Sequence, residues 1–194
     1  MTQYLQLRQR IAQISARMMV QDGITDYQQA KCKAAAQLGV PNTRHLPSNS
    51  EIEEEILIYQ RLFHADTQPL RLYQQRQVAL QAMRLLTTFR PRLVGSVLEG
   101  TALPHSNITL HLFTDTPEEV ALFLMEQSIP YELNEKRFRL PTVVNYPCYQ
   151  FMAGNETVVL VVFNRDDIRW SPPSPVNGKP MRRADLRVVE SLLE

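Results

Sequence analysis

The chain lacks the features that mark disulfide-stabilised and membrane-spanning proteins. Its 194 residues include two cysteines, Cys32 and Cys148, which form no C-x-x-C pair. This spacing excludes a disulfide framework or a zinc knuckle and predicts two reduced thiols, as in cytoplasmic proteins. No run of about 18 apolar residues is present, so we expect no membrane-spanning helix. The first ten residues are polar and lack the apolar segment of a secretory signal peptide, so the expected location is the cytoplasm.

A large excess of charge of either sign is also absent. The chain has 21 Lys and Arg residues against 20 Asp and Glu residues, a net charge of +1. Proteins that bind nucleic acid or anionic membranes usually carry a strongly basic surface. We therefore expect neither nucleic acid nor a membrane as a partner. The hydrophobic content of 44% is ordinary for a globular protein with a buried core.

Up to residue 89 the sequence pattern is helical. Apolar residues recur at intervals of three and four, which is typical of amphipathic helices. Thr25 and Ser50 are the expected N-caps of the second and third helices, because Gln28 and Glu53 follow them at the spacing of a capping box. We expect helices over residues 3–22, 25–38, 50–63 and about 69–89.

After residue 90 strands and helices alternate. Thr116 and Pro117 begin a helix, and a final helix ends near Leu193. The predicted fold class is α+β: an N-terminal helical region of about four helices, residues 1–89, packed on a mixed β-sheet with flanking helices, residues 90–194. Because no linker separates these parts, we expect one continuous body. Strands are expected over residues 93–94, 108–113, 129–133, 136–140, 149–152 and 157–163, the last two forming a hairpin.

Residues 91–115 contain the most informative motif. A short apolar strand ends in the turn Gly95-Ser96, and residues 97–106 separate this turn from the next strand. Gly95 permits a positive φ and a close backbone approach. Ser96 and the amides after it would then hold a phosphate at a helix start. The alternative is an ordinary turn at the end of a strand.

The strand that follows has one polar and one apolar face. Because side chains alternate along a strand, Asn107, Thr109 and His111 share a face, and the intervening residues form a core face. His111 is a candidate acid–base group or soft-metal ligand, since histidine titrates near neutral pH. Alternatively, it is a hydrogen-bonded histidine in the core or in a pocket wall.

These residues resemble the nucleotidyltransferase motif of the DNA-polymerase-beta-like fold, in which Gly-Ser is followed about ten residues later by Asp-x-Asp. The resemblance implies that the family carries two carboxylates at the positions that Asn107 and Thr109 occupy here. The family's third carboxylate lies on a later strand, at the position that we match to Val159. In the family, such carboxylates hold two divalent cations that clamp the attacking and leaving oxygens. Asn and Thr offer neutral oxygens only. The sequence therefore predicts a catalytically degenerate member, with no assigned metal site and with Mg²⁺ needed only if the protein is active.

The resemblance extends beyond this motif. Stretches such as LPSNSEIEE, FRPRLVGSVLEGTA and SPVNGKPMRRA are similar to an uncharacterised bacterial group labelled nucleotidyltransferase-like. That label implies a fold and no particular substrate. Near the last helix, Lys179, Arg182 and Arg183 bring three cations together in five residues. They predict an anion site at the entrance of that helix, and a solvated basic turn is the alternative.

Three functions remain open on these grounds. The first is a degenerate nucleotidyltransferase-like protein that binds a nucleotide, another phosphate ligand or a protein partner. The second is an active, metal-dependent nucleotidyltransferase in which Glu156, Asp166 or Asp167 has been recruited as a metal ligand. The third is a helical interaction module, with residues 1–89 forming a homo-oligomer or binding another protein.

Overall fold

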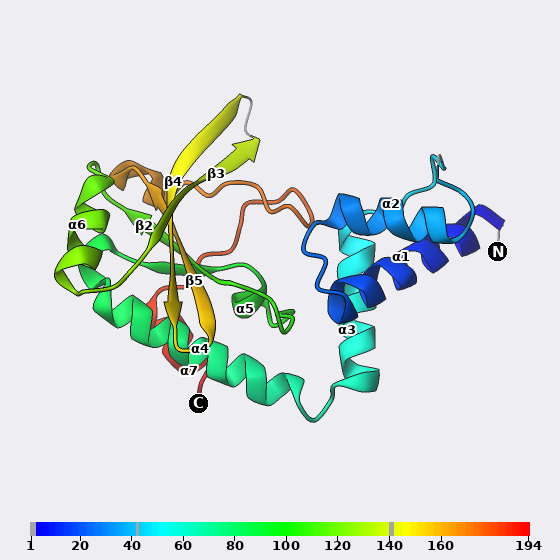
Figure 1. The fold of residues 1–194 in the computed structure, drawn as a ribbon, viewed down its shortest axis with the longest axis horizontal. Coiled ribbons are helices and arrows are strands. Elements are labelled where there is room, and N and C mark those ends of the chain that lie inside the picture. The colour runs from blue at the N-terminus through cyan, green and yellow to red at the C-terminus, as the bar shows by residue number, and fades with distance from the viewer. Residues whose placement is uncertain (1–2, 42, 140–141) are drawn as a thin grey trace. The chain divides into compact units, whose positions relative to one another are not determined.

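The sheet of the protein is mixed and has strand order β1-β2-β5-β4-β3 (Figure 1). The computed structural model describes residues 3–41, 43–139 and 142–194, and within these the sheet has five strands. β2 and β5 pair in parallel, and the other neighbouring strands pair antiparallel. The strands are β1 (Arg92–Val94), β2 (Ile108–Phe113), β3 (Glu132–Arg139), β4 (Val143–Ala153) and β5 (Glu156–Phe163).

One face of the sheet is covered by helices and forms the largest core. The alternation of β2 and β5 directs three aliphatic side chains of each strand to this face, which we call the helix-covered face. There they pack against α4 (Gln68–Leu85) and α6 (Glu118–Glu126), and α7 (Leu186–Ser191) contributes Val189. An ion pair of 2.7 Å between Arg84 and Glu190 joins α4 to α7. The fully buried aliphatic residues here include Ile108, Leu110, Leu112, Val158, Leu160 and Val162.

The other face of the sheet carries a smaller, aromatic cluster, and we call it the site face. Its buried members on β2 and β5 are Phe113, Val159, Val161 and Phe163. β5 is therefore buried on both sides, which explains its continuous run of β-branched residues. Beyond β5, the short 3₁₀ helix η2 (Arg165–Arg169) packs onto this cluster through Ile168.

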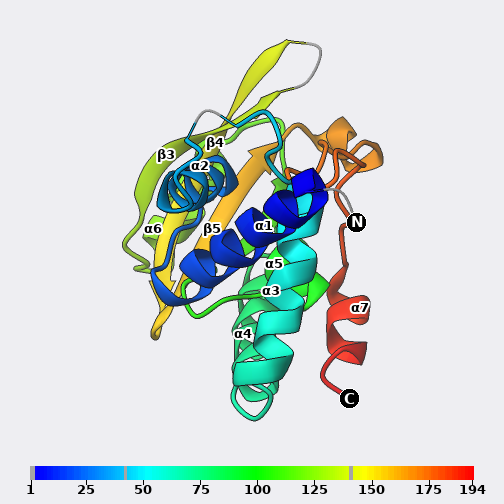
Figure 2. The same cartoon turned by 90° about the vertical axis from the view of Figure 1, so that its right-hand side faces the viewer.

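Three helices form a second core near the N-terminus: α1 (Gln3–Gln21), α2 (Tyr27–Gln37) and α3 (Asn49–Phe63) (Figure 2). Arg8 of α1 donates two hydrogen bonds of 2.6 Å to the carboxylate of Glu51 at the start of α3. This bidentate pair fixes the crossing of the two helices with charge-assisted geometry. Small side chains allow the helices to approach closely, and they include Ala12, Ala16, Ala30, Ala34 and Ala35.

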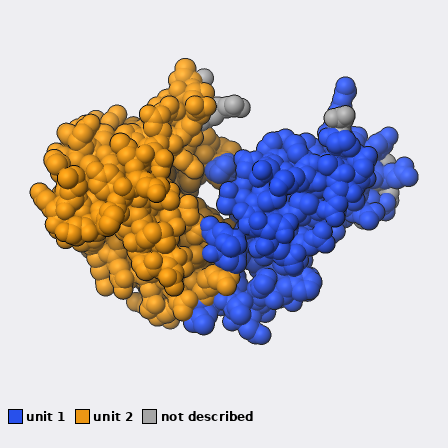
Figure 3. All heavy atoms as spheres, viewed as in Figure 1, with its two compact units in different colours: residues 1–70, 103–105, 175–177 blue, residues 71–102, 106–174, 178–194 orange. Residues whose placement is uncertain are grey.

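The chain divides into two compact units (Figure 3). The first contains residues 1–70, 103–105 and 175–177, and the second contains the sheet and the rest of the chain. The division falls inside α4 after Leu70, so most of that helix belongs to the unit with the sheet. That the two units form one continuous body stays a prediction.

The structure confirms the α+β class and most of the predicted elements, and it corrects some boundaries. Ser48, not Ser50, caps α3, with a capping box that Glu51 completes. Asp26, not Thr25, caps α2 by accepting the backbone N–H of Gln29 at 2.6 Å. The carboxylate of Glu51 thus serves both the capping box with Ser48 and the pair with Arg8.

The edge of the sheet is also simpler than predicted. Two strands were expected over residues 129–133 and 136–140, and the structure has the single strand β3, which pairs with β4 along its whole length. Leu140, the last residue of the expected second strand, lies outside the described residues. Within the described part of the chain, no helix is long and apolar enough to cross a bilayer. Cys32 and Cys148 are both free thiols.

The corrected cap of α2 gives a direct test of the helical unit. Removing the Asp26 carboxylate leaves the backbone N–H of Gln29 without its partner, so Asp26→Ala should lower the free energy of unfolding by about 1 kcal/mol. Thr25→Ala, at the neighbouring exposed position, should change it by less than about 0.5 kcal/mol. Urea unfolding followed by circular dichroism measures both variants. Equal effects would contradict the assignment of Asp26 as the cap.

Candidate functional site

The turn after β1 has a backbone conformation that requires glycine. Gly95 has φ 76° and ψ −158°, a region that other residues almost never adopt. A Cβ built there would meet no atom within 4 Å, so the requirement comes from the backbone and the space in front of the turn is open. The chain then enters the four-residue helix α5 (Ser96–Glu99). Arg76 of α4 stabilises this helix by donating to the carbonyls of Val97 and Leu98 at 3.2 and 3.3 Å.

The pairing of β1 with β2 brings the predicted polar residues together. Val94 pairs with Thr109, so the turn at Gly95 and Ser96 lies beside the start of β2, where Asn107 is located. Asn107 is exposed, and Ser96 and Thr109 are partly exposed. Their side chains make no hydrogen bond within the described residues. This end of the strand pair thus presents a hydroxyl, an amide and a second hydroxyl beside an open glycine turn.

The register of β2 with β5 brings Thr109 beside Val159, the residue that the resemblance matches to the family's third carboxylate. Thr109 pairs directly with Val159 in the parallel ladder, and Val159 is buried on the site face. The three positions are therefore occupied by Asn107, Thr109 and Val159, and none carries a charge. Among the described residues, no group of three or more His, Cys, Asp or Glu side chains is arranged to hold a metal ion.

The three acidic residues expected as alternative metal ligands lie elsewhere. Glu156 accepts a hydrogen bond of 3.1 Å from Gln75 of α4, on the helix-covered side of the sheet. Asp166 and Asp167 belong to η2, which follows the end of β5 at Phe163. That end is four residues along the ladder from Thr109, or about 13 Å at the rise of a β-strand.

An arginine occupies the other half of the site face. The Nε–H of Arg183 donates to Nδ1 of His111 at 3.0 Å, and Nη1 donates to the carbonyls of Asp167, at 2.8 Å, and Trp170. Its guanidinium carbon lies 4.8 Å from the ring centroid of Phe113 and 5.0 Å from that of Phe163. These are cation–π distances, so the charge is held over the aromatic cluster.

Burial and this contact keep His111 neutral. Burial, together with the nearby charges of Arg183 and Lys136, lowers the pKa of His111 to about 3. Because Nδ1 accepts a hydrogen bond, the ring proton resides on Nε2, which is buried without a partner among the described residues. Burial also lowers the pKa of Arg183 to about 10, with the charge of Asp167 opposing the shift. At neutral pH the pair is therefore a neutral imidazole and a guanidinium cation.

The remaining predicted anion-binding residues lie on the segment before α7. Nη1 of Arg182 is 3.9 Å from the carboxylate of Glu99, which brings it to the end of α5. Lys179 is exposed, and its carbonyl accepts the N–H of Ser174 at 2.7 Å. The role of Lys179 in an anion site stays a prediction. Sequence reasoning included Arg183 in this basic group but missed its place beside His111, because 72 residues separate the two.

Comparison with known proteins gives little beyond this geometry. No protein-family model matches the chain, and no curated protein matches it. Among solved structures, 49% of the chain is similar to the Cid1 poly(U) polymerase, in a crystal structure with MgGTP bound, at 19% identity and a TM-score of 0.33. The matched part spans 33% of that protein. A likeness of this size carries no argument for the site or its chemistry.

The buried His111 gives a pH-dependent test. A histidine in the unfolded chain has a pKa of about 6.5, whereas the pKa of His111 in the folded protein is about 3. Between these values the unfolded state binds more protons, so the free energy of unfolding falls as the pH is lowered. From about pH 7 to about pH 5 this linkage amounts to about 2 kcal/mol.

His111→Asn should remove that share of the pH dependence, because an amide does not titrate and its oxygen can accept the hydrogen bond of Arg183. Urea unfolding of both proteins at the two pH values measures the difference. The same pH dependence in the wild type and the variant would contradict a neutral, buried His111.

Proposed function

We propose that the protein is a nucleotidyltransferase-like protein that has lost catalysis and binds a phosphate-bearing ligand, such as a nucleotide, without a metal ion. One observation carries the proposal. Val94 pairs with Thr109 and Thr109 pairs with Val159, so the open turn at Gly95 and Ser96 lies beside strand positions that carry no charge, and the resemblance matches these to the family's phosphate-binding turn and carboxylate positions.

The loss of negative charge argues against catalysis. Nucleotidyl transfer depends on two divalent cations, and Mg²⁺ binds through carboxylates, phosphates and water. The amide and hydroxyl at Asn107 and Thr109 would each contribute one neutral oxygen. In addition, the cation of Arg183 is fixed over the same face of β2, and its charge opposes a second cation nearby. Both effects weaken any metal site here.

The same arrangement favours an anionic ligand. Gly95 leaves open space in front of the turn, and the side chains of Ser96, Asn107 and Thr109 have no hydrogen-bond partner within the described residues. Neutral hydroxyl and amide groups bind phosphate oxygens well when a positive charge is near. Arg182, whose side chain reaches Glu99 at the end of α5, can provide this charge.

Calorimetric titration with ATP, CTP, GTP and UTP tests the proposal. We expect at least one nucleotide to bind equally well with and without Mg²⁺, and no nucleotidyl transfer to occur. Ser96→Ala should weaken this binding by about tenfold, the typical effect of losing one hydrogen bond to a charged group. Ser191→Ala, an exposed serine in α7 of the same unit, is the matched control and should leave binding unchanged.

The double variant Asn107→Asp, Thr109→Asp extends the same titration. It restores two carboxylates to one face of β2, so nucleotide binding should become dependent on Mg²⁺. Wild-type binding that requires Mg²⁺, or product formation by the wild type, would instead support an active enzyme. The absence of binding for all four nucleotides would reject the proposed ligand class.

The helical unit favours a second candidate function, self-association. A hollow of about 360 Å³ lies between α1 and α3, and its apolar lining includes Ile58, Tyr59 and Leu62. Leu62 is 70% exposed and the adjacent Phe63 is 65% exposed. Exposed apolar groups of this kind are frequent at protein–protein interfaces.

Light scattering after size-exclusion chromatography tests self-association. A dimer through this surface predicts twice the mass of the 22.4 kDa chain, and Leu62→Ser should return the mass to that of one chain. Leu122→Ser, which replaces a similarly exposed leucine of α6, should leave the dimer intact. A single-chain mass for the wild type at high concentration would reject this candidate.

A further inference from the structure

A second hollow lies in the unit with the sheet, at the opposite end of β1 from Gly95. It has a volume of about 330 Å³ and is lined by the turn η1 (Thr87–Phe89), the start of β1 and the start of α7. Reciprocal backbone hydrogen bonds of 2.9 Å between Leu93 and Ala184 hold the segment before α7 along the free edge of β1. The walls of the hollow therefore belong to fixed backbone.

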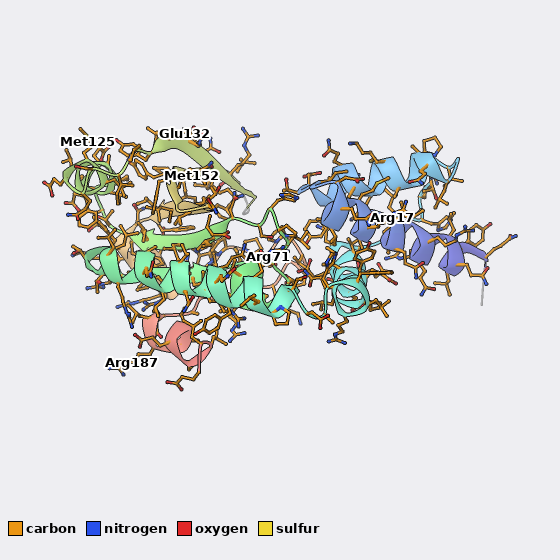
Figure 4. All side chains as sticks on the ribbon, turned by 60° about the horizontal axis from the view of Figure 1, so that its bottom comes forward. Arg17, Arg71, Met125, Glu132, Met152 and Arg187 are labelled. Carbon is orange, nitrogen blue, oxygen red and sulfur yellow. The ribbon has the colours of Figure 1, made fainter. Side chains whose placement is uncertain are left out.

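The charge in this hollow is strongly positive. Three arginines line it, Arg90, Arg92 and Arg187, and the single carboxylate is that of Asp185. Asp185 is the N-cap of α7 and already accepts the N–H of Val188 at 3.0 Å. The side chains of Arg90 and Arg187 form no ion pair or hydrogen bond within the described residues. Figure 4 labels Arg187 on α7. Three neighbouring cations repel one another unless an anion joins them.

The backbone of Arg90 supports a role for its side chain. Arg90 has φ 50° and ψ 55°, a left-handed conformation that glycine adopts at lower energy. A residue in this position commonly ends a helix, and glycine is the usual choice. Residues with strained backbone conformations are frequent at ligand sites, where the side chain contributes to binding although the conformation costs energy. Here the strained residue is one of the three arginines in the hollow.

We propose that Arg90, Arg92 and Arg187 form a binding site for a phosphate group on a small ligand. Guanidinium groups bind phosphate through paired hydrogen bonds, and two of these arginines have theirs uncommitted. The volume lies near the lower limit of small-molecule sites, which suits a phosphate or pyrophosphate with a small substituent. The site is separate from the turn at Ser96 and does not depend on the proposed nucleotide function.

Titration of the full chain with inorganic pyrophosphate at low ionic strength tests this site. The wild type should bind, and inorganic phosphate should bind more weakly because it carries less charge. Arg187→Gln should weaken pyrophosphate binding by about tenfold. Arg137→Gln, which replaces an exposed arginine of β3 outside the hollow, should leave it unchanged.

Arg90→Gly separates a binding role from a structural one. It removes a cation and relieves the left-handed strain, so it should raise the melting temperature by about 2–4 °C while weakening pyrophosphate binding by about tenfold. If Arg90 only supported the fold, Arg90→Gly would lower both the melting temperature and the affinity for pyrophosphate. Equal weakening in Arg90→Gly and Arg137→Gln would indicate general attraction between charges and would overturn the proposal, as would no binding by the wild type.

The two ligand sites can be told apart in the same assay. If the hollow binds pyrophosphate, Arg187→Gln should weaken this binding by the same factor whether or not Ser96→Ala is also present. A loss of pyrophosphate binding in Ser96→Ala alone would assign the anion to the turn and overturn this inference. Nucleotide binding that fails while pyrophosphate binding persists would reject only the function proposed above.

Discussion

The parallel pairing of β2 with β5 is the constraint on which the rest of the structure depends. Six residue pairs, from Ile108 with Val158 to Phe113 with Phe163, run in unbroken register. Since side chains alternate, a slip of one residue would turn the aliphatic core outward and the aromatic cluster inward. Burial on both faces excludes such a slip. The same register sets Thr109 beside Val159 and so determines which groups can meet a ligand.

The site face shows how a cation can be accommodated on a sheet beside aromatic rings and a neutral histidine. Arg183 reaches it from a segment that runs along the edge of β1, and it is held by His111, two carbonyls and two aromatic rings. Hydrogen bonds from Nε and Nη1 and the two aromatic faces offset part of the cost of removing this guanidinium from water, whereas Nη2 is buried without an acceptor among the described residues. The neutral form of His111 follows first from its burial and then from this contact, because a second cation beside Arg183 would be repelled.

The segment that precedes α7 connects the two positively charged regions of this unit. Arg183 lies on the site face, Ala184 bonds to β1, and Arg187 lies at the hollow. The charge of Arg92, at the start of β1, also lowers the pKa of Arg183.

The sequence by itself determined the elements, the α+β class, the glycine turn and the alternation that puts Asn107 and Thr109 on one face of β2, because each depends on local spacing. It did not determine the cap at Ser48, because Ser50 with Glu53 has the same capping-box spacing, or the continuous strand β3, which pairs with β4 along its whole length. Nor could it find the contact of Arg183 with His111 or the three arginines around the hollow. Those residues are far apart along the chain, and only the strand register and the edge of β1 bring them together.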